Sequence, residues 1–171
     1  MRFAIRRTLA RTVLPGLALL AAAVTACVTV RSVSAQTEMR TVTPAQLQWV
    51  DAPPGLPPGA KVAILQGDPT KPGPFTLRFR VPAGYKVPAH WHPTDENVTV
   101  LKGTLRVGKG EKFEPSTLQD LPAGSFMRMP KTMRHYAQAK GETILQLHGI
   151  GPFEIHYVNP GDDPRKKALK K

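Results

Sequence analysis

The sequence predicts an all-β domain, built as an antiparallel barrel or a jelly roll of two sheets, on three observations. The 171 residues include 18 prolines and 14 glycines, which interrupt helices and favour turns. Residues 75–81 alternate between apolar and polar side chains, as a half-buried strand does. Further short runs follow at regular spacing, each bounded by a glycine or proline turn. This length suits one domain with a single hydrophobic core.

The run at 75–81 is expected to bury Phe75, Leu77, Phe79 and Val81 on one face. The other expected strands are, in chain order, Lys61–Gln66, Asn97–Leu101, Thr104–Val107, Ser125–Met129, His135–Ala139, Thr143–His148 and Phe153–Val158. A helical turn is expected only within Glu111–Leu121. The domain therefore spans residues 60–159, with an extended, proline-rich lead-in at 36–59 before it and a basic tail at 160–171 after it.

The N-terminus predicts export. A basic segment, Met1–Val13, precedes an apolar one, Leu14–Val30, and small residues end at Ala35, which is the order of a secretory signal peptide at 1–35. The expected location is periplasmic or secreted, without stable membrane insertion after cleavage behind Ala35. Lipidation at Cys27, the single cysteine, is the second alternative, and an uncleaved anchor is the third.

The formal net charge of +12 does not predict nucleic-acid binding, because the charge gathers at the two ends. Five of the 24 Lys and Arg residues lie in the first 35 positions and five follow Pro164, which leaves fourteen cations against twelve anions in between. Such a body lacks the basic face that nucleic acid requires. The tail is expected to be a disordered, solvated terminus.

Three of the five histidines indicate a metal site. His90 and His92 are two residues apart, so that in a strand both side chains point to the same face. Glu96 follows, and a short hairpin there would fold its carboxylate back beside the two rings. His135 begins a later strand. Three imidazoles and a carboxylate suit one divalent ion of iron, manganese, zinc, nickel or copper, with a position left for water or substrate.

These residues resemble the cupin superfamily. Gly84-x5-His90-x-His92-x3-Glu96-x6-Gly103 contains every landmark of its first motif, and Gly124-x5-Pro130 followed by His135 resembles its second. The second match departs at Thr132 and Ala139, where the family has glycine and asparagine. The resemblance implies a small single-domain cupin jelly roll, metal ligands at His90, His92, Glu96 and His135, and a homodimer.

The remaining candidates have ordinary structural explanations. His148 and His156 are expected to be strand residues, with a place for His148 in the pocket as the alternative. Trp91 should face away from the histidines beside it. Arg128 is expected in solvent, with an anchor for an anionic substrate as the alternative, and Asp95 is expected to be an exposed turn residue.

The leading hypothesis is an exported metal-dependent enzyme that acts on a small organic molecule. The resemblance implies oxygenase, isomerase or decarboxylase chemistry, with a dioxygenase-like reaction foremost. The competing hypothesis is a periplasmic sensor or sequestering protein that binds a ligand or metal without catalysis. Neither a phosphate-binding glycine loop nor a Gly-x-Ser-x-Gly motif occurs in the sequence.

Overall fold

The computed structural model of the chain describes residues 39–168, with side chains to Lys166. The predicted signal peptide at 1–35, including Cys27 and the cleavage position behind Ala35, lies outside the described residues. Over the described range, every helix is too short and too polar to cross a bilayer.

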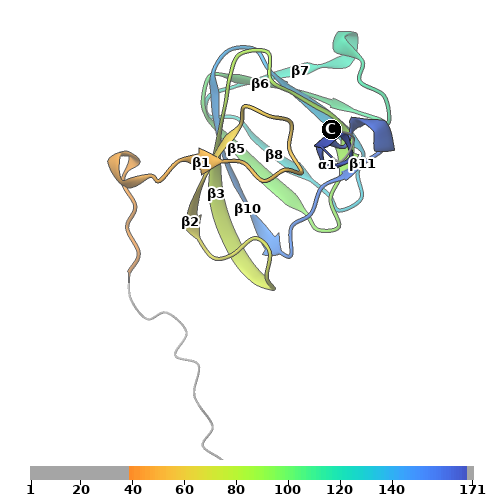
Figure 1. Cartoon of the computed structure of the whole chain (residues 1–171). Coiled ribbons are helices and arrows are strands. Elements are labelled where there is room, and N and C mark those ends of the chain that lie inside the picture. The colour runs from red at the N-terminus through yellow and green to blue at the C-terminus, as the bar shows by residue number, and fades with distance from the viewer. Residues whose placement is uncertain (1–38, 169–171) are drawn as a thin grey trace, which may run out of the picture. The chain divides into compact units, whose positions relative to one another are not determined.

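Two antiparallel sheets form the domain (Figure 1). One sheet has six strands in the order β1-β2-β3-β10-β5-β8, which span Val50–Asp51, Lys61–Gln66, Gly73–Val81, Thr143–Gly151, Glu96–Lys102 and Phe126–Met129. The other has five in the order β11-β4-β9-β6-β7, which span His156–Tyr157, Lys86–Trp91, His135–Ala139, Thr104–Lys109 and Gln119–Pro122. From β3 to β6, and again from β7 to β11, each strand lies in the opposite sheet from the one before it. This alternation makes the fold a jelly roll.

The hydrophobic core lies between the two sheets. Phe75, Leu77 and Val98 reach it from the six-stranded sheet, and Leu105 and Val107 reach it from the five-stranded sheet. The alternation predicted along β3 is confirmed, because its apolar side chains face this core. On the outer face of the same strand, the Arg78 guanidinium donates to the Gln146 side chain of β10.

All of the expected strands are present, and their bounds differ most from the prediction in the last strand. The run predicted at Phe153–Val158 is a strand only at His156–Tyr157. The carbonyls of Glu154 and Ile155 instead accept hydrogen bonds from side chains, those of His92 and Arg165. The helical turn expected within 111–121 is a single 3-10 turn at Pro115–Thr117, and β7 follows it.

The two flanking segments are more ordered than predicted. In the lead-in, a 3-10 turn at Pro44–Gln46 is followed by β1, which pairs with β2. The tail forms a 3-10 turn at Pro160–Asp162 and helix α1 at Pro164–Ala168, drawn in dark blue in Figure 1. The Arg165 guanidinium donates to Asp163 and to the carbonyl oxygen of Ile155. The expectation of a disordered tail is therefore wrong as far as Arg165, and the packed domain extends beyond 60–159 at both ends.

Candidate metal centre

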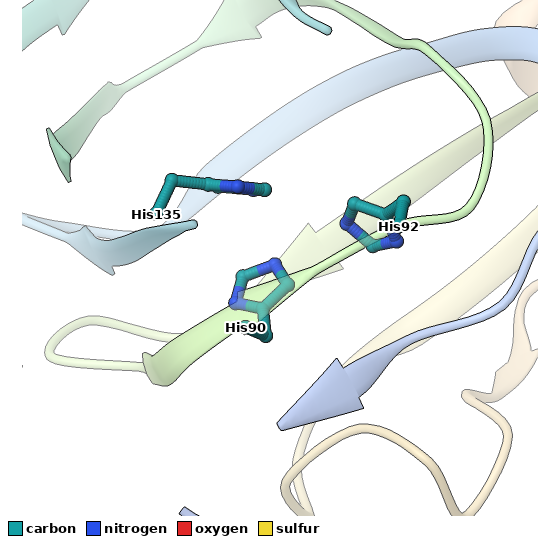
Figure 2. Close-up of side chains that lie close together, drawn as sticks. All are labelled: His90, His92 and His135. Carbon is teal, nitrogen blue, oxygen red and sulfur yellow. The ribbon is translucent and has the colours of Figure 1, made fainter. Parts of the chain in front are cut away.

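Three histidines from two neighbouring strands converge inside the domain (Figure 2). His90 lies in β4, His92 follows its last residue, and His135 begins β9. The register pairs His90 directly with His135 across the two strands. One ring nitrogen of each histidine lies within 4.8 Å of those of the other two, and the residues are at most 5% exposed. The predicted convergence of these imidazoles is confirmed.

A backbone carbonyl fixes the tautomer of each ring. His90 Nδ1 lies 2.7 Å from the carbonyl oxygen of Pro88, His92 Nδ1 lies 2.6 Å from that of Glu154, and His135 Nδ1 lies 3.0 Å from that of Met133. A carbonyl oxygen only accepts, so each Nδ1 carries the proton and donates. In the neutral rings, the three Nε2 atoms then present lone pairs, which is the form in which histidine binds a metal.

Glu96 joins the histidines, although the hairpin predicted for it is wrong. The residues after His92 connect β4 to β5, and these strands belong to different sheets. The connection crosses the barrel edge and places Glu96 Oε2 3.7 Å from His92 Nε2 and 3.2 Å from His135 Nε2. Glu96 Oε2 and His92 Nε2 are buried without a hydrogen-bond partner. A carboxylate oxygen and imidazole lone pairs at such distances repel one another unless a cation or a proton lies between them.

Burial and mutual contact set the ionisation of the group. Burial lowers the pKa of His90 to about 3, with further lowering by His135 and His92, and burial also lowers the pKa of His92. These two rings are therefore neutral near pH 7. Burial raises the pKa of Glu96, but His135 and the neighbouring rings lower it more, to about 2. Burial lowers the pKa of His135, whereas the Glu96 carboxylate raises it above its usual value, since that carboxylate favours positive charge at His135 Nε2.

A cavity of about 280 Å³ opens beside the three histidines. Apolar side chains from both sheets line it, among them Val62, Leu77, Val87, Val98, Leu105 and Leu145. The proline-rich segment of the lead-in contributes Pro53, Gly55 and Leu56 to its wall. Phe153 stacks on the His92 ring with the centroids 4.4 Å apart and also lines the cavity. The lining therefore offers an apolar space with its polar atoms gathered at the cluster.

The proline-rich segment is held by two tyrosines. The Tyr157 hydroxyl donates to the carbonyl oxygen of Gly55 at 2.9 Å, and the Tyr85 hydroxyl donates to that of Pro57 at 2.6 Å. Tyr157 also pairs with His90 in the register of β11 and β4. The sequence does not predict the role of either tyrosine, because their hydrogen-bond partners are backbone atoms that only the fold brings close to them.

Two hydrogen bonds connect the segment of the first cupin motif with that of the second. The backbone N–H of Thr132 donates to the carbonyl oxygen of His92 at 2.8 Å, and the N–H of Lys131 donates to Asp95 at 2.8 Å. Thr132 has a φ of +65°, the conformation that favours glycine, and it occupies the position where the cupin motif has glycine. This departure therefore leaves the backbone shape intact.

The other candidate residues lie away from the cluster. Arg128 forms an ion pair with Asp95 at 2.6 Å on the surface, with 57% of its side chain exposed, so it does not anchor a ligand in the cavity. His148 is exposed on β10 and is not part of the lining. Trp91 faces away from the cluster as predicted, and stacks on His156 with the centroids 4.3 Å apart.

The jelly roll and the buried histidine cluster together define a cupin with a candidate metal centre. The family model of the ChrR cupin-like domain matches residues 37–154. The chain belongs to this family.

Solved structures share the fold at low sequence identity. The polyketide cyclase RemF from Streptomyces resistomycificus is 15% identical, with a TM-score of 0.60 over 77% of this chain and 94% of that chain. An acetylacetone dioxygenase from Acinetobacter johnsonii is 18% identical, with a TM-score of 0.56 over 74% of this chain and 80% of that chain. An RmlC-like cupin from Shewanella frigidimarina NCIMB 400 is 17% identical, with a TM-score of 0.51 over 66% of this chain and 91% of that chain. No curated protein matches the sequence.

Proposed function

We propose that the chain is a metal-dependent enzyme acting on a small organic molecule. Its ligands for one divalent ion of iron, manganese, zinc, nickel or copper are His90, His92, Glu96 and His135. The observation that carries the proposal is the direction of the three Nδ1 protons toward carbonyls. In the neutral rings, this leaves three Nε2 lone pairs and the buried Glu96 carboxylate for a cation. Imidazole and carboxylate ligands suit these ions.

A bound ion supplies a Lewis-acid or oxygen-activating centre. The chain contributes the rest of the site. Carbonyl oxygens hold the rings in place, Phe153 covers the His92 ring, and the apolar lining limits the access of water to the cluster. The dioxygenase among the similar structures makes a dioxygenase-like reaction the first to test.

A non-catalytic binding protein is the second candidate. The observation that favours it is the lining itself. Apart from the histidines, the one ionisable side chain that the described residues place there is Tyr85, and burial raises its pKa. Within the described part of the chain, no other side chain of the lining is ionisable.

Metal content and oxygen uptake test both candidates. The purified mature protein is analysed for transition metals and then assayed for oxygen consumption with phenols, diketones and sugar acids. A stoichiometric metal with turnover supports the enzyme, whereas retained ligand without turnover supports the binding protein. His92→Ala should lower the metal content, because it removes one of the four proposed ligands and the loss of a ligand weakens the site.

The matched control for His92→Ala is His148→Ala, which removes an exposed histidine of β10. This variant should keep the metal of the wild-type protein. Unchanged metal content in His92→Ala would remove the site assignment and, with it, the proposed function.

Export and a homodimer complete the proposal. The signal-like N-terminus supports export, and N-terminal sequencing of the mature protein from the periplasm should begin at Gln36, or at a lipidated Cys27 in the alternative. The free edges at β1 and β8 of the larger sheet expose Val50 and Phe126, and covering such edges favours pairing of two chains. Sedimentation should give twice the mass of the mature chain, and a monomer would contradict the dimer.

A further inference from the structure

The charge of the cavity lining restricts what the cavity binds. Of the described residues that line it, none is Lys, Arg, Asp or Glu. The polar residues other than the histidines are Thr70, Tyr85 and Gln138, and the first two donate their hydroxyl protons to Asp68 and to the Pro57 carbonyl. Gln138 alternates in β9 with Ala137 and Ala139, so its side chain lies on the opposite face of the sheet.

A charged group far from the histidines would therefore lack a partner. Burial of an ionised group without a counter-charge is unfavourable, and it should lower the affinity of a ligand by at least about tenfold. Apart from the hydroxyl oxygens of Thr70 and Tyr85, the polar side-chain atoms that the described residues offer a ligand lie at the end of the cavity formed by His90, His92 and His135. The arrangement thus separates a polar end from an apolar body.

The size of the cavity limits the ligand further. Its volume of about 280 Å³ is nearly twice the roughly 150 Å³ of an apolar protein cavity that holds benzene. One six-membered ring with short substituents fits this volume.

We propose that the ligand of this site is a small molecule with one metal-directed polar end and an uncharged, apolar body of about one ring. The metal-directed end of the ligand rests on the proposed function, because it requires the metal site. The apolar body rests on the cavity lining alone. Acids with a charge at the far end, and sugar acids with polar groups all round, are excluded as ligands.

A matched pair of catechols tests the proposal in the zinc-loaded protein. 4-Methylcatechol and 3,4-dihydroxybenzoate present the same two adjacent hydroxyls. At the far end of the ring, the first carries a methyl group and the second carries a carboxylate. Calorimetry should show at least tenfold tighter binding of 4-methylcatechol. Equal or tighter binding of the carboxylate would overturn the proposal.

A second pair separates this inference from the metal assignment. Neither ethylbenzene nor 1,4-phenylenediacetate needs the metal to bind, and the second carries a carboxylate at each end, so that one charge must lie among apolar side chains. Ligand-observed NMR on the metal-free protein should detect binding of ethylbenzene only. If the protein retains no metal, the proposed enzyme fails but this result still decides the nature of the cavity. Absence of ethylbenzene binding, or binding of both probes, would overturn the inference.

Two neighbouring residues of β10 supply matched variants. Leu145 lines the cavity, whereas Ile144 does not. Leu145→Phe should reduce the affinity for ethylbenzene at least tenfold and keep the metal content, and Ile144→Phe should change neither. Ala137→Val, a smaller addition to the lining, is the substitute if Leu145→Phe does not fold. If Leu145→Phe and Ile144→Phe bind ethylbenzene with equal affinity, the probe binds outside the cavity, and the proposal is contradicted.

Discussion

Single backbone atoms decide the chemistry of the histidine cluster. The carbonyl oxygens of Pro88, Met133 and Glu154 take the Nδ1 protons of the three rings. Two of these carbonyls lie two residues before their histidine in the chain, whereas Glu154 lies 62 residues after His92. The local pairs keep their geometry wherever β4 and β9 form, but the ring of His92 depends on the C-terminal segment.

Thr132 carries local strain that glycine would relieve. A left-handed conformation costs a residue with a Cβ atom about 1–2 kcal/mol, and Thr132 has this conformation at φ +65°. Glycine loses part of that gain through its greater freedom in the unfolded chain. We expect Thr132→Gly to raise the free energy of unfolding by about 0.5–1 kcal/mol, measured by denaturant titration.

The control for this substitution is Thr76→Gly in β3, where the backbone is extended. It should lower the free energy of unfolding, because glycine weakens a strand interior. A loss of stability in Thr132→Gly would show that the Thr132 hydroxyl, which donates to the carbonyl of Lys131 at 2.6 Å, outweighs the strain.

Among the elements, the strands were predictable where their side chains alternate. β3 matches the pattern closely, because Phe75, Leu77 and Val81 are buried while the residues between them are only partly buried. β1 and β7 were not predicted, since they have two and four residues and little apolar character to reveal their pairing. The hairpin expected before Glu96 failed for a related reason, because local spacing does not reveal which of two sheets a strand joins.

The proline-rich segment 53–58 is held against the cavity by side chains of other elements. Tyr157→Phe removes a buried donor and leaves the carbonyl oxygen of Gly55 unpaired, which costs about 1–3 kcal/mol. We expect a loss of this size in the free energy of unfolding, measured by denaturant titration. Tyr85→Phe acts on the same segment, so the double variant should lose less than the sum of the two. Additive losses would show that the two bonds act independently.

In the whole molecule, metal binding and folding should be linked. The proposed ligands come from β4, from the residue that follows it, from β9 and from the start of β5. The unfolded chain does not bring them together, so the ion should bind the folded state preferentially. At a free concentration a thousandfold above its Kd, an ion stabilises by about 4 kcal/mol. This corresponds to a rise of about 10 °C in Tm for a domain of this size.

Thermal unfolding with added zinc and with a chelator measures the effect. The Tm of the wild-type protein should rise with zinc concentration, and the Tm of His92→Ala should remain near that of the chelated protein. An equal rise in both proteins would indicate that zinc binds outside the cluster.

The sequence alone was sufficient to predict the class of fold and the four side chains that cluster. Alternation and turn residues are local properties, and the histidine and glutamate spacing follows a family motif. The packing of distant segments decided the rest: the pairing of Glu154 with His92, the wall formed by the proline-rich segment, and the docking of Arg165. These contacts involve backbone atoms that lie far apart in the chain. Because a backbone carbonyl is the same in every residue, no pattern of side chains predicts them.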